Sequence, residues 1–513
     1  MRTNGESMKN VYLPASVFVS GASILAIEIL GTRILGPFYG VSLFLWSTLI
    51  ATTLIALSVG YYVGGLVADR HATYGRLSLL LLASGLWVMI VPLICGPILT
   101  VAASLGLRTA VFLTAFLLFF PPLALLGMIS PIAVRLRATS LDIVGRSAGI
   151  LSSISTLAGV LSALATAIFF IPYLGLTAFT LLIGVALLVT GLIGFVLDKS
   201  QKLSKGGSIT AVLVVMVLIC VAAIHGQGKG RNSLVEIQSQ YAELRVVDRD
   251  DSRYLLVDGA IHTQVDTSTW QSRLEYVAVM DLPMYMFERN GAALLIGLGG
   301  GSIVKNYVFW NWTVDAVEID PEIARLASTY FGLKRHEATI CTMDGRRYLE
   351  ETAKQYDIVL IDAFGSSSIP FHMVTAEAFR LCRNRLKPDG VLAVNVVAIG
   401  WNDRMVRSVA ATLRTEFSEV IALPIAEPPD RLGNVVLMAS NRKLDLKMDV
   451  ERHYWDREYR YGPKYQRVHA WDNQFSPNPN GAEIVTDDRN PVDVWSEVIN
   501  YADRQELLSW LKE

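Results

Sequence analysis

The sequence predicts an α-helical multi-pass membrane domain fused to an α/β domain. Three observations predict this class: charge is distributed unevenly, seven long apolar runs occupy the first half, and short strands alternate with helical patterns in the second half. Such alternation is typical of a doubly wound, Rossmann-like sheet. We expect the membrane domain at residues 1–226, a small β-rich subdomain acting as a substrate lid at 227–285, and the Rossmann-like domain with a C-terminal tail at 286–513.

Charge separates the two halves. Residues 1–226 contain 12 of the 45 Lys and Arg residues and 5 of the 46 Asp and Glu residues, so their net charge is +7, whereas residues 227–513 carry −8. The second composition is that of a soluble domain. A purely soluble protein is therefore excluded, and the negative charge of the second half argues against nucleic acid as a partner.

Seven apolar runs have the length of about 18–20 residues that a helix needs to cross a bilayer. They are residues 11–31, 41–66, 77–104, 109–134, 147–171, 173–197 and 208–225. We expect a helical bundle in the cell (inner) membrane, in contact with the lipid bilayer, because unpaired backbone cannot face lipid. Glu28 lies inside the first run, and an ionisable residue at such a position is often functional.

Strands and helical patterns alternate from residue 292 to residue 440. The run AALLI at 292–296 is followed by a glycine cluster and a helical pattern, which indicates a buried parallel strand leading into a helix. Further strands are predicted within 313–320, 338–344, 356–362, 386–397 and 422–440. The pattern predicts a parallel sheet with helices on both faces.

Acidic residues end three successive strands: Glu318 with Asp320, then Asp344, then Asp362. The carboxyl ends of neighbouring parallel strands meet at one crevice, where ligands bind in open α/β sheets. Glycines before a helix let a ligand approach the backbone and its amide groups. The expected cofactor-binding glycines are Gly297, Gly299, Gly301 and Gly345.

This arrangement predicts a nucleoside site. Glu318 would bind ribose hydroxyls, Asp344 would accept a hydrogen bond from an adenine amine, and Asp362 would face the reacting centre. The four cysteines have no C-x-x-C spacing, so neither a zinc site nor a redox pair is expected, and we expect no metal.

The second half resembles S-adenosylmethionine-dependent enzymes, and more specifically the spermidine synthases, or polyamine aminopropyltransferases. The motifs that carry the resemblance are Ser239 and Tyr241 in SQY, Asp258, Gly259 and Gln264 in DGAIHTQ, the loop IGLGGG, EID at 318–320, Asp344–Gly345, Asp362 after YDIVLI, and LKPDG at 386–390. The stretches 28–40 and 130–136, and TDDRNPVD at 486–493, resemble the membrane-fused members of this family.

The resemblance implies that decarboxylated S-adenosylmethionine donates an aminopropyl group to an amine such as putrescine and releases methylthioadenosine. It implies that Gln264 and Asp320 bind the donor, and that Tyr241 and Asp258 lie on the substrate side. Asp362 would be catalytic: an amine with a pKa of about 10 must lose a proton before it attacks, and a carboxylate can position it and accept that proton.

Two positions depart from the family pattern. Gly300 and Gly365 stand where the resemblance places carboxylates that bind ammonium groups. Unmodified S-adenosylmethionine, which carries its own carboxylate, is therefore also a candidate co-substrate. Asp487 or Asp488 in the tail is a candidate substitute for a missing acid, and His262 and His372 are candidate bases near the crevice.

Three other functions stay open beside the membrane-anchored aminopropyltransferase. They are a lyase, cyclase or aminocarboxypropyl transferase that forms methylthioadenosine from S-adenosylmethionine, a methyltransferase for a membrane substrate, and a transporter with a nucleoside-sensing domain. A homo-oligomer is compatible with the sequence. Lys and Arg in the loops place the N-terminus inside and, with seven spans, residues 227–513 outside. A cofactor supplied from the cytosol requires residues 227–513 to lie inside, so the side of the membrane on which they lie is left open.

Overall fold

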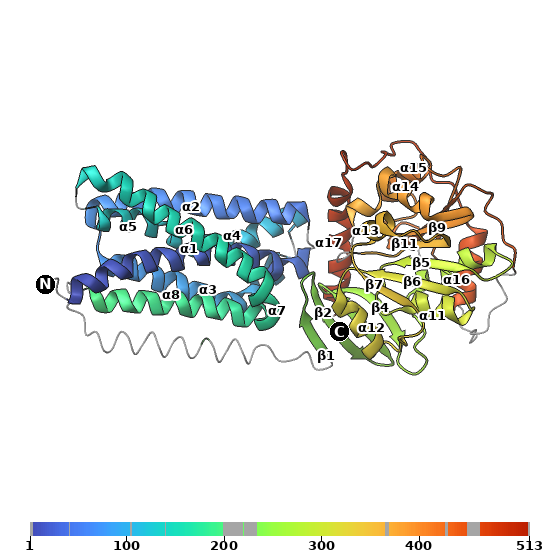
Figure 1. Cartoon of the computed structure of the whole chain (residues 1–513), viewed down its shortest axis with the longest axis horizontal. Helices are drawn as coiled ribbons and strands as arrows, with labels where there is room; N and C mark the ends of the chain where they lie inside the picture. The colour runs from blue at the N-terminus through green and yellow to red at the C-terminus, as the bar shows by residue number, and fades with distance from the viewer. Residues whose placement is uncertain are drawn as a thin grey trace. The chain divides into compact units, whose positions relative to one another are not determined.

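The chain forms two compact units, Met1–Arg231 and Asn232–Glu513. The computed structural model describes residues 4–39, 42–102, 105–138, 140–198, 219, 233–364, 369–425, 429–448 and 462–510. Figure 1 shows the first unit in blue to teal and the second in green to red. The second unit carries the acidic strand ends that the sequence singles out.

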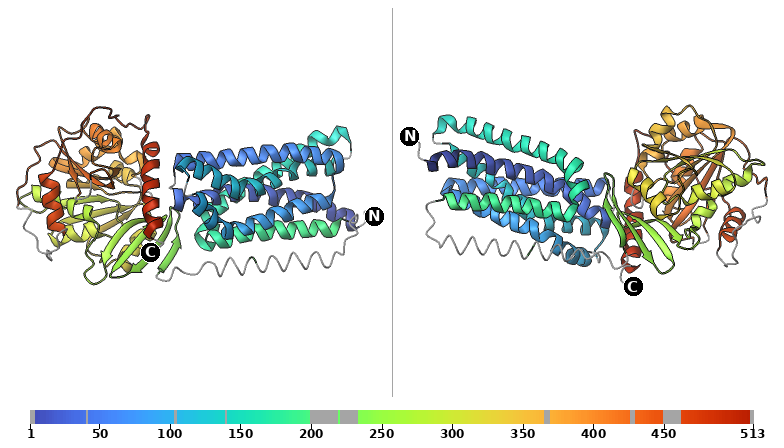
Figure 2. Two further views of the ribbon diagram at one scale, coloured as in Figure 1. Left: turned by 180° about the vertical axis from the view of Figure 1, so that it is seen from behind. Right: turned by 60° about the horizontal axis from the view of Figure 1, so that its bottom comes forward.

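The first unit is a bundle of long apolar helices (Figures 1 and 2). Its elements are α1 (Asn4–Tyr39), α2 (Leu43–His71), α3 (Tyr74–Ala102), α4 (Leu107–Gly127), α5 (Ile129–Arg137), α6 (Val144–Ala165), the π turn η2 (Thr166–Phe170), α7 (Ile171–Leu174) and α8 (Leu176–Leu197). Six helical stretches of the described chain are long and apolar enough to cross a membrane, by length and composition. The seventh predicted run, 208–225, lies outside the described residues except for Ile219.

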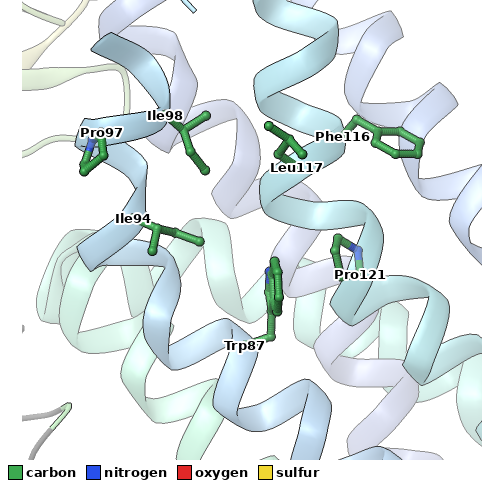
Figure 3. Close-up of a pocket in the computed structure, with 7 residues that line it drawn as sticks. All are labelled: Trp87, Ile94, Pro97, Ile98, Phe116, Leu117 and Pro121. Carbon is green, nitrogen blue, oxygen red and sulfur yellow. The ribbon is translucent and has the colours of Figure 1, made fainter. Parts of the chain in front are cut away.

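Small residues bring helices of this unit close together. A Cβ atom on Gly64 of α2 would lie 2.7 Å from the Cα of Met128, and one on Gly60 would overlap the carbonyl oxygen of Ala124. Glycines at such positions allow the backbones of two apolar helices to touch. An apolar pocket opens between α3 and α4 (Figure 3), and it is lined by Trp87, Ile94, Pro97, Ile98, Phe116, Leu117 and Pro121.

The second unit begins with a four-stranded antiparallel sheet, β1 (Ser233–Gln238), β2 (Glu243–Arg249), β3 (Ser252–Val257) and β4 (Ala260–Asp266). Asp258 and Gly259 form the two-residue turn between β3 and β4, with φ angles of +47° and +79°. Positive φ at both positions is the geometry of a type I′ hairpin turn, for which Asp-Gly is a favoured pair.

The second sheet has seven strands in the order β10-β11-β9-β8-β5-β6-β7. They are β5 (Ala292–Ile296), β6 (Thr313–Glu318), β7 (Thr339–Thr342), β8 (Tyr356–Ile361), β9 (Leu386–Ile399), β10 (Glu419–Pro424) and β11 (Leu432–Ser440). Strands β5 to β9 are parallel, whereas β11 pairs antiparallel with both β9 and β10. The Rossmann-like fold is thus confirmed, but the expectation of a wholly parallel sheet is wrong at this edge.

Helices bury both faces of this sheet. They are α10 (Glu275–Val279), α11 (Ser302–Phe309), α12 (Pro321–Tyr330), α13 (Gly345–Glu351), α14 (Ala376–Arg385), α15 (Arg404–Leu413), α16 (Pro463–Asp472) and α17 (Val492–Trp510), with the 3₁₀ turns η3 (Leu282–Met286) and η4 (Phe371–Met373). Along β5, Leu294 and Ile296 enter one apolar core, and Ala293 and Leu295 enter the other. A strand buried on both faces reads as the continuous apolar run seen in the sequence.

One buried ion pair links the C-terminal part to the helix before β5. Arg467 of α16 is fully buried, and its guanidinium lies 3.8 Å from a carboxylate oxygen of Asp281, just after α10. Asn306 of α11 donates a hydrogen bond to the same carboxylate at 3.1 Å. Asp281 lies between two short helical segments, since α10 ends at Val279 and a separate 3₁₀ turn starts at Leu282.

Candidate active site

The glycine loop connects β5 to α11 at the carboxyl edge of the sheet. Gly297 has a φ of +93°, and a Cβ there would overlap the carbonyl oxygen of Asp362. The loop backbone therefore passes directly beside the strand end that carries the predicted catalytic carboxylate. Gly301, with a φ of +77°, is the N-cap of α11 and directs the chain into that helix.

Thr263 of β4 connects the small sheet to this loop. Its Oγ1 accepts a hydrogen bond from the backbone N–H of Gly300 at 2.8 Å. A Cβ on Gly300 would lie 2.6 Å from Cγ2 of Thr263 and 3.1 Å from the ring of Phe331. A side chain at position 300 would therefore require Thr263 and Phe331 to shift.

Glu318 holds the glycine loop from the end of β6. Its carboxylate accepts hydrogen bonds from the N–H groups of Leu298 and Asp320, each at 3.0 Å. Burial raises the pKa of Glu318, although the backbone hydrogen bonds oppose this shift. Asp320 is buried and caps α12, accepting from the N–H of Glu322 at 2.9 Å. Both residues thus fix the backbone at the carboxyl edge of the sheet.

Asp344 follows β7 and caps α13, accepting from the N–H of Arg347 at 3.0 Å. Its second oxygen lies 3.0 Å from Nε2 of His372, and this hydrogen bond is the main cause of the lowered pKa of Asp344. The next residue, Gly345, packs so closely that a Cβ would overlap the side chain of Ile296 in β5. His372, a candidate base in the sequence, is thus a partner of Asp344.

Asp487 in the C-terminal tail does not approach Asp362 through any described contact. It forms a two-pronged ion pair with Arg346 of α13, with one N···O distance of 2.7 Å. This pairing lowers the pKa of Asp487. Arg346 also donates to the carbonyl oxygen of His372 at 3.2 Å, so the tail is fastened to the segment that bears this histidine.

Asp362 follows β8 and lies at the centre of a hydrogen-bond network. Oδ2 accepts from the hydroxyl of Tyr276 at 3.1 Å, and Oδ1 accepts from the amide of Asn395 at 2.8 Å. The Oδ1 of Asn395 in turn accepts from Asn434 Nδ2 at 2.9 Å. Burial raises the pKa of Asp362 to about 6, although both of its hydrogen bonds lower it. A carboxylate with this pKa is ionised at neutral pH and can still accept a proton.

Three residues of the predicted site make structural contacts in the small sheet. Gln264 donates to the hydroxyl oxygens of Ser252 and Tyr254, at 3.2 and 3.0 Å. Asp258 accepts from the N–H of Glu243 at 2.9 Å and shapes the hairpin turn. Tyr241 is 47% exposed in the turn between β1 and β2, where its N–H donates to Oγ of Ser239 at 3.0 Å. Gly365, the second departure from the family pattern, lies outside the described residues.

Sequence reasoning missed Thr263, Tyr276, Asn395 and Asn434. Asn395 had a usable signal, because it is the one amide in the apolar run VLAVNVV, next to the strand that ends at Asp362. Tyr276 and Asn434 had none, since the role of Asn434 depends on strand order and that of Tyr276 on where α10 packs. Among the described residues there is no group of three or more His, Cys, Asp or Glu side chains that could hold a metal ion.

Comparison with known proteins gives the family of the chain. The model of the spermine/spermidine synthase domain matches residues 274–449. A polyamine aminopropyltransferase of Neisseria meningitidis serogroup A is 30% identical over 191 residues, which is 36% of this chain and 70% of the relative. The chain belongs to the spermine/spermidine synthase family.

Further relatives of this family are more distant. A polyamine aminopropyltransferase of Vibrio vulnificus is 26% identical over 245 residues, covering 45% of this chain and 80% of the relative. The solved spermidine synthase of Thermotoga maritima is 18% identical, covers 49% of this chain and 86% of that structure, and has a TM-score of 0.40. The family expected from the motifs is confirmed, and with it an enzyme of the aminopropyltransferase class.

Proposed function

We propose that this chain is a membrane-anchored aminopropyltransferase. It transfers an aminopropyl group from decarboxylated S-adenosylmethionine to a primary amine such as putrescine and releases methylthioadenosine. The observation that carries the proposal is the buried network at Asp362. A carboxylate with a raised pKa, held by Tyr276 and Asn395 beside the glycine loop, has the properties of a general base for an amine nucleophile.

The chemistry follows from the two hydrogen bonds that Asp362 already accepts from Tyr276 and Asn395. A carboxylate has about four lone-pair positions, so one hydrogen bond on each oxygen leaves room for the ammonium of an acceptor. Asp362 takes a proton from that ammonium. The freed amine forms a C–N bond with the carbon next to the sulfonium as the C–S bond breaks, and the sulfur keeps the electron pair. Holding both reactants in line supplies much of the rate.

The donor is assigned to the crevice between the glycine loop and the strand ends. Gly297, Gly299 and Gly301 let its nucleoside approach the backbone, and Glu318 holds that loop in place. Asp344 and Gly345 would face the adenine, and Asp320 supports the same edge. Gln264, Tyr241, Asp258 and Asp487 make the structural contacts described above, which supports them less as ligands than Asp362.

One observation favours a second candidate function on the same site. The side chains of Thr263 and Phe331 occupy the space next to Gly300, where an acid would bind the aminopropyl ammonium. Intact S-adenosylmethionine keeps its own carboxylate, so its binding is weakened less by the absence of an acid at position 300. The second candidate is therefore a lyase, cyclase or aminocarboxypropyl transferase acting on intact S-adenosylmethionine.

The membrane location is part of the proposal. Six stretches of the described chain have the length and apolar composition of membrane spans, and they precede the catalytic unit. Length and composition support an anchor in the cell membrane, with the catalytic unit on the side where the nucleoside donor is available.

A product assay tests the proposal. The detergent-purified full chain is offered intact or decarboxylated S-adenosylmethionine, each with and without putrescine, and the nucleoside released is identified. Methylthioadenosine from only the decarboxylated donor with putrescine is expected. Asp362→Asn should abolish most of this turnover, and Asp389→Asn, at an exposed position near the start of β9, should not. Methylthioadenosine from intact donor without amine would establish the second candidate, and S-adenosylhomocysteine would indicate methyl transfer.

A further inference from the structure

The helices α1 and α6 of the first unit pack against each other with their backbones nearly in contact. A Cβ on Gly21 of α1 would overlap Ser155 of α6. One turn further along both helices, a Cβ on Gly159 would lie 3.0 Å from Leu25. The contact moves forward by four residues on each helix, so the two helices run in the same direction and share one register.

This register leads to Glu28. The residues Gly21, Leu25, Glu28 and Thr32 follow a spacing of four, three and four, which keeps them on one face of α1. The same spacing on the partner helix gives Ser155, Gly159, Ser162 and Thr166. Continuing the register from Gly21 and Ser155 by eleven residues on each helix brings Thr32 and Thr166 to one level, next to Glu28.

The two threonines have buried hydroxyls with no hydrogen-bond partner. Thr32 is 4% exposed and Thr166 is fully buried, and the Oγ1 of each lacks a partner in the described structure. A buried hydroxyl without a hydrogen bond is costly, so such groups call for an explanation. Thr166 also begins the π turn η2, and π turns inside helices are frequent at functional sites.

Glu28 adds a negative group to these two acceptors. It is partly buried, and within the described part of the chain no hydrogen bond or ion pair joins its carboxylate to another residue. Arg33 lies five positions later, about 140° around the helix, so it does not share this face. A carboxylate in an apolar bundle needs either a proton or a cation beside it.

We infer that Glu28, Thr32 and Thr166 form a binding site for a primary ammonium group inside the first unit. An ammonium group has three N–H donors, and this site offers one carboxylate and two hydroxyl acceptors to receive them. Leu25 lies one turn before Glu28 on the same face of α1, and its apolar side chain suits an alkyl chain attached to the ammonium. Ions such as calcium bind six to eight oxygen atoms, more than this site supplies.

Binding of labelled putrescine to the full chain in detergent tests this inference. Asp362→Asn is present in every sample, so that the second unit contributes equally to all of them. Glu28→Gln should weaken putrescine binding at least tenfold, and Asp142→Asn, an exposed acid of the same unit, should leave it within twofold. Equal binding by Glu28→Gln and its parent would overturn the inference. The test does not depend on turnover, so it stands or fails separately from the proposed function.

Two further measurements keep the test decisive. Thr32→Val combined with Thr166→Val removes both hydroxyls at nearly constant volume and should also weaken binding at least tenfold, whereas Thr166→Ser should not. Carbodiimide labelling of Glu28, read by mass spectrometry, should be prevented by putrescine and not by NaCl at the same ionic strength. If NaCl protects Glu28 from labelling and putrescine does not, the site binds sodium and not an ammonium group. If neither compound protects Glu28, the inference is refuted.

Discussion

Tyr276 donates a hydrogen bond to Asp362 across 86 positions of sequence, over a distance of 3.1 Å. The tyrosine comes from α10, before the first strand of the large sheet, and the aspartate comes from the end of β8. The proposed base is therefore fixed from two sides, by a helix outside the sheet and by Asn395 within it. Its ionisation depends on both contacts.

The pH dependence of turnover should report the ionisation of Asp362. Its pKa is raised to about 6, and a general base works only when it is deprotonated. We therefore expect kcat/KM to fall about tenfold for each pH unit below about 6 and to level off above it. Release of methylthioadenosine measured from pH 5 to pH 8 checks this. A flat profile over that range would exclude Asp362 as the base.

Tyr276→Phe should shift this profile. The Tyr276 hydroxyl lowers the pKa of Asp362, so its removal should raise that pKa and move the acid limb to higher pH. Loss of a hydrogen bond to a charged group costs about 1.5–3 kcal/mol, so kcat should fall roughly tenfold to a hundredfold. Tyr330→Phe serves as the control and should keep the parent profile. An unshifted limb would show that Tyr276 does not act through Asp362.

Asn395→Asp should move the acid limb of the pH profile to higher pH by more than Tyr276→Phe does. It places a second carboxylate in hydrogen-bond reach of Asp362, and two neighbouring carboxylates raise the pKa of the pair. Activity at pH 7 should drop and recover toward pH 9. Asn434→Asp, one hydrogen bond further away, should give a smaller shift. If both variants keep the parent pH profile, Asn395 and Asn434 do not influence the pKa of Asp362.

Gly297→Ala and Gly299→Ala should differ in stability. At Gly297 a Cβ would overlap the carbonyl oxygen of Asp362 at a φ of +93°, so the free energy of unfolding should fall by about 3 kcal/mol or more. Gly299 has a φ of +51°, within the left-handed helical region, and its nearest neighbour would be 3.0 Å away. That variant should lose about 1–2 kcal/mol. Denaturant unfolding, followed by a signal from the catalytic unit, measures the loss in each variant. Equal losses in Gly297→Ala and Gly299→Ala would contradict this prediction.

Arg467→Met should destabilise the fold in a pH-dependent way. Burial raises the pKa of Asp281 to about 7, and Arg467 lowers it. A carboxyl whose folded pKa exceeds its unfolded value of about 4 loses its stabilising contribution as pH rises through the folded pKa. Without Arg467 the folded pKa rises further, so the loss relative to the parent should grow as pH rises above about 7 and reach about 3–5 kcal/mol at pH 8.

The double variant Asp281→Asn/Arg467→Met is the matched control for this prediction. It removes both charges, so its unfolding free energy relative to the parent should vary much less with pH. Thermal and denaturant unfolding at pH 5 and pH 8 give the comparison. A pH-independent deficit in Arg467→Met would mean that the side chain contributes packing alone.

The sequence predicted the strands of the large sheet because both of its faces are buried, so apolar runs such as 292–296 mark them directly. The strand-end positions of Glu318, Asp344 and Asp362 follow from the same runs, and their roles in binding remain predictions. The reversed direction of β11 leaves no trace in an apolar pattern. The contact of Asn434 depends on which strands are neighbours, and that of Tyr276 depends on where α10 packs against the sheet. Tertiary structure decides both.

The edge of the large sheet has a consequence for how the chain is made. β10 (Glu419–Pro424) pairs with β11 (Leu432–Ser440), and β11 lies between it and β9. A ribosome delivers β10 first, so this strand waits for the segment after it before it can join the sheet. Val485 then accepts a hydrogen bond from the N–H of Ala376. Val492 and Ile499 of α17 belong to the same apolar core, so translation has to pass Ile499 before the earlier strands and helices of the catalytic unit are fully enclosed.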